Sequence, residues 1–216
     1  MRCLLMRMRM ATVRLSDERY EEIKQEVADL YIRNNINSVP IYVQNLNKDQ
    51  HFKLKSYSSM GTKARSLSEA FTNDAFVLKD VSGYSGVDRI YFSDECCRGR
   101  KRFSLCHEIG HSVLLHIKED EENEAEADFF ASYLMAPPPL IIAQKCQNVY
   151  DIICTFDVSF EMASNAWKRY QQWLHQFSFM RQIKLADYEC KILKQFGFEP
   201  DEILCEIKRI LGRNIA

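Results

Sequence analysis

Glycine and proline are scarce in this chain of 216 residues, which has seven glycines and five prolines. Tight turns depend on these two residues, so the composition favours a helix-rich fold. The formal net charge is −1 at pH 7, which gives no indication of a nucleic-acid or anionic-membrane partner. The sequence also lacks a run of about 18 apolar residues, so we expect no membrane span.

The eight cysteines show no Cys-x-x-Cys spacing and no paired framework. Several lie in apolar periodic segments, where a free cysteine behaves as a small buried hydrophobe. The apolar run at the N-terminus is short and interrupted by arginine, which does not fit a signal peptide. We therefore expect a reduced, cytoplasmic protein.

Apolar periodicity predicts a helix over residues 16–33 and then three strands, at 51–57, 75–78 and 89–92. A polar, glycine-containing loop joins the last two strands, as in an antiparallel hairpin. We expect a small antiparallel three-stranded sheet, with 89–93 as its edge strand.

The helical period returns at Phe103, and a further helix is predicted from about Asn123 to Met135, where prolines end it. The fold class is therefore α+β and helix-rich, with a C-terminal helical region. Further helices are predicted near 140–147, 149–156, 159–177, 183–196 and 200–211.

The segment His107-Glu108-Ile109-Gly110-His111 has the pattern of a catalytic zinc site. Residues i and i+4 share a helix face, so both imidazoles can bind one metal ion. Glu108 lies where a carboxylate can take a proton from zinc-bound water. Gly110 inside the helix indicates the close approach of another element.

A catalytic zinc site takes three protein ligands, and the next helix offers the third. Glu124 and Asp128 are i and i+4, whereas Glu126 points elsewhere. We predict that Glu124 binds the metal and that Asp128 accepts a hydrogen bond from the outer N–H of a ligand histidine. The alternative is a solvated acidic helix face.

Two segments carry a family resemblance: RFSLCHEIGH at 102–111 and EAEADFFASYLMAP at 124–137. They resemble the ImmA/IrrE family of zinc metallopeptidases, over about residues 15–175. Members typically carry Arg-Phe-(Ser/Thr)-x-Ala-His-Glu-(Leu/Ile)-Gly-His, then Glu-x-x-Ala-Asn-x-Phe-Ala-x-x-Leu-Leu-Met-Pro. This chain departs from that pattern at Cys106, where alanine is usual, and at Asp128, where asparagine is common. It also has Leu-Met-Ala-Pro in place of Leu-Leu-Met-Pro.

The resemblance implies a zincin-like core over 1–140, with the sheet packed on the His-Glu-x-x-His helix, and a helical region over 141–216. It implies His107, His111 and Glu124 as ligands of one Zn²⁺ and Glu108 as general base, as in gluzincins. The implied activity is endopeptidase cleavage of a cytosolic repressor or antitoxin-like partner, often encoded in a phage or mobile element.

Residues 150–174 are a candidate helix-turn-helix, which keeps a DNA- or protein-binding adaptor without catalysis as the alternative function. Its second helix carries Trp167, Tyr170 and Trp173 and is too apolar for a groove-reading helix, so core packing is the better interpretation. We therefore expect no direct binding of nucleic acid. Tyr91, His116 and Tyr133 are candidates for stabilising the oxyanion.

Overall fold

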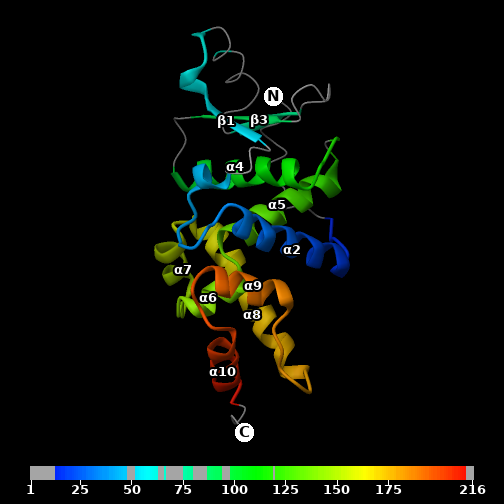
Figure 1. Cartoon of the computed structure of the whole chain (residues 1–216), viewed down its shortest axis with the longest axis vertical. Coiled ribbons are helices and arrows are strands. Elements are labelled where there is room, and N and C mark those ends of the chain that lie inside the picture. The colour runs from blue at the N-terminus through cyan, green and yellow to red at the C-terminus, as the bar shows by residue number, and fades with distance from the viewer. Residues whose placement is uncertain are drawn as a thin grey trace. The chain divides into compact units, whose positions relative to one another are not determined.

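The computed structural model describes residues 13–47, 52–62, 66, 75–79, 87–93, 98–118 and 120–212. Over these residues the fold is helix-rich α+β, as predicted (Figure 1). Tertiary contacts divide the chain into two units: residues 1–23 with 43–131, and residues 24–42 with 132–216. The predicted boundary at residue 140 stays a prediction. The elements, in chain order, are α2 (Asp17–Arg33), η1 (Val43–Asn47), β1 (Phe52–Ser56), η2 (Tyr57–Ser59), β2 (Ala75–Leu78), β3 (Asp88–Phe92), α4 (Arg98–Val113), α5 (Glu121–Met135), α6 (Pro138–Ala143), α7 (Val149–Phe156), α8 (Phe160–Phe179), α9 (Asp187–Gln195) and α10 (Pro200–Ile210).

The three predicted strands form one sheet, in the order β1-β3-β2. β2 and β3 pair antiparallel, which confirms the hairpin, but β1 pairs parallel with β3. The prediction of a wholly antiparallel sheet is therefore wrong. Alternation within a strand fixes which side chains share a face but not the direction of the neighbouring strand. Here residues 57–87 separate the parallel partners, so their connection is a crossover instead of a hairpin.

The sheet order also corrects the predicted edge. β3 lies in the centre, with Ile90 fully buried, and the edges are β1 and β2. The sequence could not show this, because an apolar strand has the same pattern whether it pairs with one neighbouring strand, at an edge, or with two, in the centre.

Helix α4 packs against β2 and β3, as expected for the motif helix (Figure 1). It begins at Arg98, five residues before the apolar period at Phe103 became visible in the sequence. Arg102 in this first part of the helix is buried. The motif therefore lies well inside a regular helix, where its side chains have fixed directions.

In the second unit, α7 and α8 pack against each other across a short turn. Asp157 adopts a left-handed conformation at the end of α7, and the Ser159 hydroxyl caps α8 by accepting a hydrogen bond from the Met162 N–H. Tyr170 and Trp173 are buried, which confirms the predicted core role for these two residues, whereas Trp167 is half-buried. No helix among the described residues has both the length and the apolar character that a membrane span requires.

Candidate metal centre

The two motif histidines lie one turn apart on α4 and turn the same ring nitrogen toward each other. Their Nε2 atoms are 3.0 Å apart, and both residues are buried. The predicted i and i+4 convergence is therefore present in the structure.

Helix α5 comes close to this turn at Gly110. A Cβ atom at Gly110 would lie 3.0 Å from Cδ1 of Phe130 and 3.3 Å from Cα of Ala127, so this glycine allows the close approach that its place in a helix predicted. The approach places Glu124 beside both histidines. Its Oε1 lies 3.2 Å from Nε2 of His111, and its Oε2 lies 3.4 Å from Nε2 of His107.

These three side chains form a group that could hold a metal ion, with all three donor atoms within 4.8 Å of one another. Ligand atoms 2.0–2.2 Å from a tetrahedral zinc ion lie roughly 3.4 Å apart. The two imidazole nitrogens are 3.0 Å apart, and each lies 3.2 or 3.4 Å from one of the two Glu124 oxygens, which is close to that requirement. Two imidazoles and one carboxylate are also a donor set that zinc uses in hydrolases, so the residues fit the ion. The Glu124 side chain is 42 % exposed, which leaves one side of the group accessible.

The charges around the group favour a cation. Burial opposes a charge on His107, but hydrogen bonds to Asp128 and Glu124 prevail and raise its pKa to about 9. Hydrogen bonds from His107 and His111 hold the pKa of Glu124 well below its usual range. Without metal, the His107 ring therefore carries an extra proton at neutral pH, which a divalent cation would displace.

Glu108 is buried next to the group, with 5 % of its surface exposed. Its negative charge contributes to the raised pKa of His107.

The neighbouring Cys106 is different, because burial raises the pKa of its thiol to about 12 and so keeps it uncharged. This cysteine is therefore a packing residue at the position where the family usually has alanine. None of the five cysteines in the described ranges forms a disulfide.

The outer nitrogen of His107 has the partner that the sequence predicted. Its Nδ1 lies 2.8 Å from Oδ1 of Asp128, one turn after Glu124 on α5. One helix thus contributes both a candidate ligand for the metal and the acceptor for a histidine ring.

The outer nitrogen of His111 has a partner that the sequence analysis missed. Its Nδ1 lies 2.9 Å from Nδ1 of His116, and Nε2 of His116 lies 2.8 Å from Oε2 of Glu126. Both ring nitrogens of His116 are therefore occupied, which leaves none to stabilise an oxyanion. Burial, together with the charges of His111 and Arg19, lowers the pKa of His116 in spite of its hydrogen bond to Glu126. The spacing of five residues between the two histidines was the available sequence signal.

Arg19 of α2 completes this side of the centre. Its Nε donates to Oε1 of Glu126 at 2.7 Å and its Nη2 to Oε2 at 2.5 Å. Burial would raise the pKa of Glu126, but the hydrogen bonds from Arg19 and His116 lower it. Glu126 does point away from Glu124 and Asp128, as predicted, yet it reaches the centre through His116.

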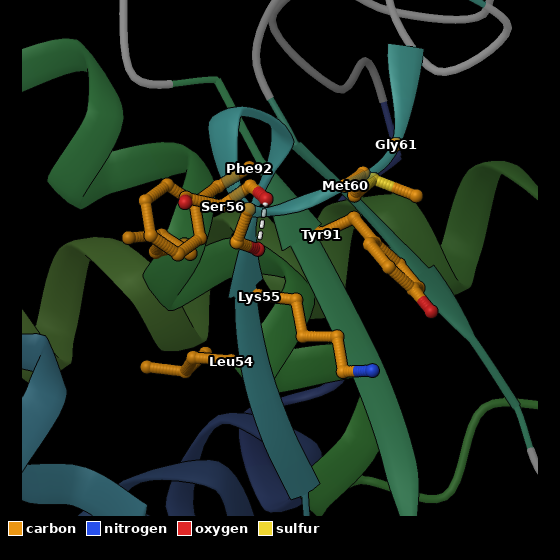
Figure 2. A pocket seen from close by; sticks show the side chains of 9 residues that line it. Leu54, Lys55, Ser56, Met60, Gly61, Tyr91 and Phe92 are labelled. Atoms are coloured by element: carbon orange, nitrogen blue, oxygen red, sulfur yellow. Dashed lines mark hydrogen bonds between the residues drawn. The ribbon is translucent and has the colours of Figure 1, made fainter. Parts of the chain in front are cut away.

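The two tyrosine candidates lie elsewhere. Tyr91 stacks on Phe76 at 5.2 Å between ring centroids and lines a pocket of about 640 Å³ between β1, β3 and the chain after η2. Figure 2 shows Tyr91 and Lys55 extending to the same side of the strands, and none of the three metal-group residues lines this pocket. Tyr133 is buried in the second unit, where burial raises its pKa well above the usual value.

Comparison with known proteins gives one match. The sequence model of the IrrE N-terminal-like domain, which describes a peptidase family, matches residues 67–168. This range includes β2, β3 and the two helices that carry the candidate metal group. No curated protein and no solved structure matches the chain.

Proposed function

Because residues 67–168 place this chain in the ImmA/IrrE family of metallopeptidases, we propose that it is a zinc-dependent endopeptidase that cleaves a cytosolic protein partner. The observation that carries the proposal is the convergence of His107, His111 and Glu124 beside the buried Glu108. The donor set is that of hydrolytic zinc sites, and the helix between the histidines supplies the carboxylate that hydrolysis requires.

In this proposal His107, His111 and Glu124 hold the ion. A bound Zn²⁺ would supply Lewis acidity, which lowers the pKa of water and polarises a carbonyl. Asp128 fixes the ring of His107 by accepting its Nδ1–H at 2.8 Å, so that Nε2 keeps a lone pair for the metal.

Glu108 is the proposed general base. It accepts a proton from the attacking water and delivers that proton to the nitrogen of the scissile peptide bond as the bond breaks. The product is then a neutral amine and not a poor amide-anion leaving group. Burial beside the candidate metal group suits this role, because few bulk water molecules can compete for the carboxylate.

The proposed substrate class is a transcriptional repressor or an antitoxin-like protein encoded near the peptidase in a phage or mobile element. Support for this class comes from the family resemblance alone. An adaptor that binds a partner without cleaving it is the second candidate. The observation that favours it is the pair of exposed aromatic rings of Tyr150 and Phe160 on α7 and α8, whose centroids lie 6.2 Å apart.

The decisive experiment compares the wild-type protein with Glu108→Gln. Metal analysis of both should find about one zinc per chain, because Glu108 is not a ligand. On incubation with a neighbouring repressor or antitoxin, mass spectrometry should show defined fragments with the wild type and intact partner with the variant. Intact partner with zinc-loaded wild type, under conditions where a reference peptidase is active, would reject that substrate. A partner bound equally by both proteins and cleaved by neither would support the adaptor.

A further inference from the structure

The contact between His111 and His116 restricts where the hydrogen atoms can lie. Two ring nitrogens 2.9 Å apart can form a hydrogen bond only when one carries hydrogen and the other offers a lone pair. If Nε2 of His111 binds a metal, its neutral ring must carry hydrogen on Nδ1. Nδ1 of His116 must then be the acceptor.

The rest of the chain of contacts agrees with that assignment. A neutral His116 that accepts at Nδ1 carries its hydrogen on Nε2, which faces the Glu126 carboxylate at 2.8 Å. The carboxylate is in turn held by two hydrogen bonds from Arg19. One arrangement of hydrogens thus accounts for both contacts, the one between His111 and His116 and the one between His116 and Glu126. It also leaves Nε2 of His111 free to bind metal.

The backbone explains how a residue beyond α4 returns to that helix. The N–H of His116 donates to the His111 carbonyl at 3.0 Å, and the N–H of Leu115 donates to the Ser112 carbonyl at 3.3 Å. Leu115 has φ 58, so these contacts form a Schellman turn at the helix end. The turn folds the chain back so that the two imidazoles meet, with ring centroids 5.0 Å apart.

A second contact fastens the same turn. The Lys79 ammonium, just after β2, donates to the His111 carbonyl at 2.7 Å and pairs with Asp88 at 2.9 Å. Asp88 also accepts a hydrogen bond from the Ser112 hydroxyl at 2.5 Å. The hairpin therefore holds the end of α4 where the histidines meet.

Burial distinguishes His116 from a solvent-exposed neighbour. The side chains of His116 and Glu126 are 4 % and 7 % exposed. Water cannot easily replace either partner, so the orientation of His111 depends on His116 itself.

We propose that His116 is a positioning residue for the metal centre, which fixes the ring of His111 through a relay from Glu126 and Arg19. The inference rests on the proposed function, because it takes His111 as a metal ligand. His116 acts through His111 and is not itself a ligand: Nδ1 and Nε2 are both engaged.

The test uses the full-length protein with His116→Phe and His116→Gln. Phenylalanine fills the space without a hydrogen-bonding atom, whereas glutamine offers an oxygen to accept from His111 and an N–H to donate to Glu126. Glu126 keeps its Arg19 partner in both variants, so neither leaves an unpaired buried charge. His175→Phe, at an exposed histidine on α8, is the matched control.

Zinc affinity, measured by competition with a chromophoric chelator, should fall roughly 10- to 100-fold in His116→Phe. His116→Gln should lie nearer the wild type, and His175→Phe should match it. In NMR spectra of the zinc-loaded wild type, His107 and His111 should each show a slowly exchanging ring N–H. The His111 signal should be lost in His116→Phe and present in His116→Gln.

Thermal unfolding in EDTA separates positioning from a general loss of stability. Wild-type affinity in His116→Phe would overturn the inference while leaving the metal site intact. The inference would also be overturned if zinc affinity fell equally in His116→Phe and His116→Gln, in parallel with a fall in the thermal stability of the metal-free proteins. A wild-type protein that binds no zinc would reject the proposed function and this inference together.

Discussion

The two histidines of the candidate metal centre are held in different ways. His107 contacts a carboxylate directly, and that Asp128 side chain is 44 % exposed. His111 contacts a buried imidazole, behind which Glu126 is already paired with Arg19. The partner of His107 is thus a charged carboxylate that water can reach. The partner of His111 is a buried imidazole, and the Glu126 carboxylate behind it is neutralised by Arg19.

This difference separates two tasks. The direct contact with Asp128 places negative charge next to the centre, which stabilises a cation there and helps raise the pKa of His107 to about 9. The relay adds almost no net charge, because Arg19 balances Glu126, and it fixes geometry instead. A metal site needs both a favourable charge and a fixed ligand geometry. In this proposal Asp128 supplies the charge and His116 fixes the geometry.

The largest expected loss of zinc affinity comes from removing Glu124, which contacts both His107 and His111. Glu124→Ala should weaken zinc binding by more than the roughly 100-fold upper limit for outer partners, because it removes a proposed ligand. The pKa of His107 should also fall in the metal-free protein, since its hydrogen bond to Glu124 is lost. Zinc competition and an NMR titration measure the two effects. Glu122→Ala, an exposed residue on the same helix, is the control and should change neither.

Removing only Asp128, the exposed partner of His107, should reduce zinc affinity less. In Asp128→Ala water can take the place of the exposed carboxylate, so we expect zinc affinity to fall about 10-fold, near the lower limit for outer partners. The pKa of His107 should fall as its charged partner is lost. If Asp128→Ala weakens zinc binding more than His116→Phe does, the proposed contrast between the two sides is wrong.

A further effect concerns the end of the relay and depends on pH. Arg19 and His116 lower the pKa of Glu126 in the folded protein, so the charged carboxylate stabilises the fold. That stabilisation is complete above the unfolded value of about 4.3 and is lost as pH falls through the lower, folded pKa. Glu126→Gln should therefore lower the free energy of unfolding by about 1–3 kcal/mol at pH 7, with the difference shrinking at acid pH.

Urea unfolding of the metal-free proteins between pH 7 and pH 3 measures this effect. The control is Glu22→Gln, which removes the exposed partner of Arg19 and should cost less than about 1 kcal/mol. A difference between wild type and Glu126→Gln that stays constant down to pH 3 would contradict the assigned role of the charge.

Much of the centre could be predicted because it depends on helix periodicity. The pairs His107–His111 and Glu124–Asp128 are each i and i+4, and this spacing alone places them on one face of their helix. Gly110 likewise indicated that another element packs closely against this helix, since a glycine inside a helix is unfavourable without a packing reason. These predictions needed no knowledge of what lies far away in the chain.

The relay could not be predicted on those terms. His116 reaches His111 only because the chain turns back at Leu115, a residue that gives no sign of a left-handed conformation. Glu126 faces Arg19, which lies 107 residues earlier, and no local pattern joins the two. The parallel pairing of β1 with β3 has the same origin, because strand direction follows from the path of the intervening chain.

The sequence by itself determined the helix-rich class, the two histidines on one turn of α4 and the carboxylates of α5 that accompany them. Tertiary structure decided the mixed sheet, the central place of β3 and the buried histidine behind His111. The physical reason is range: helix geometry repeats every few residues and can be found in a short segment, whereas contacts between distant segments depend on how the whole chain packs.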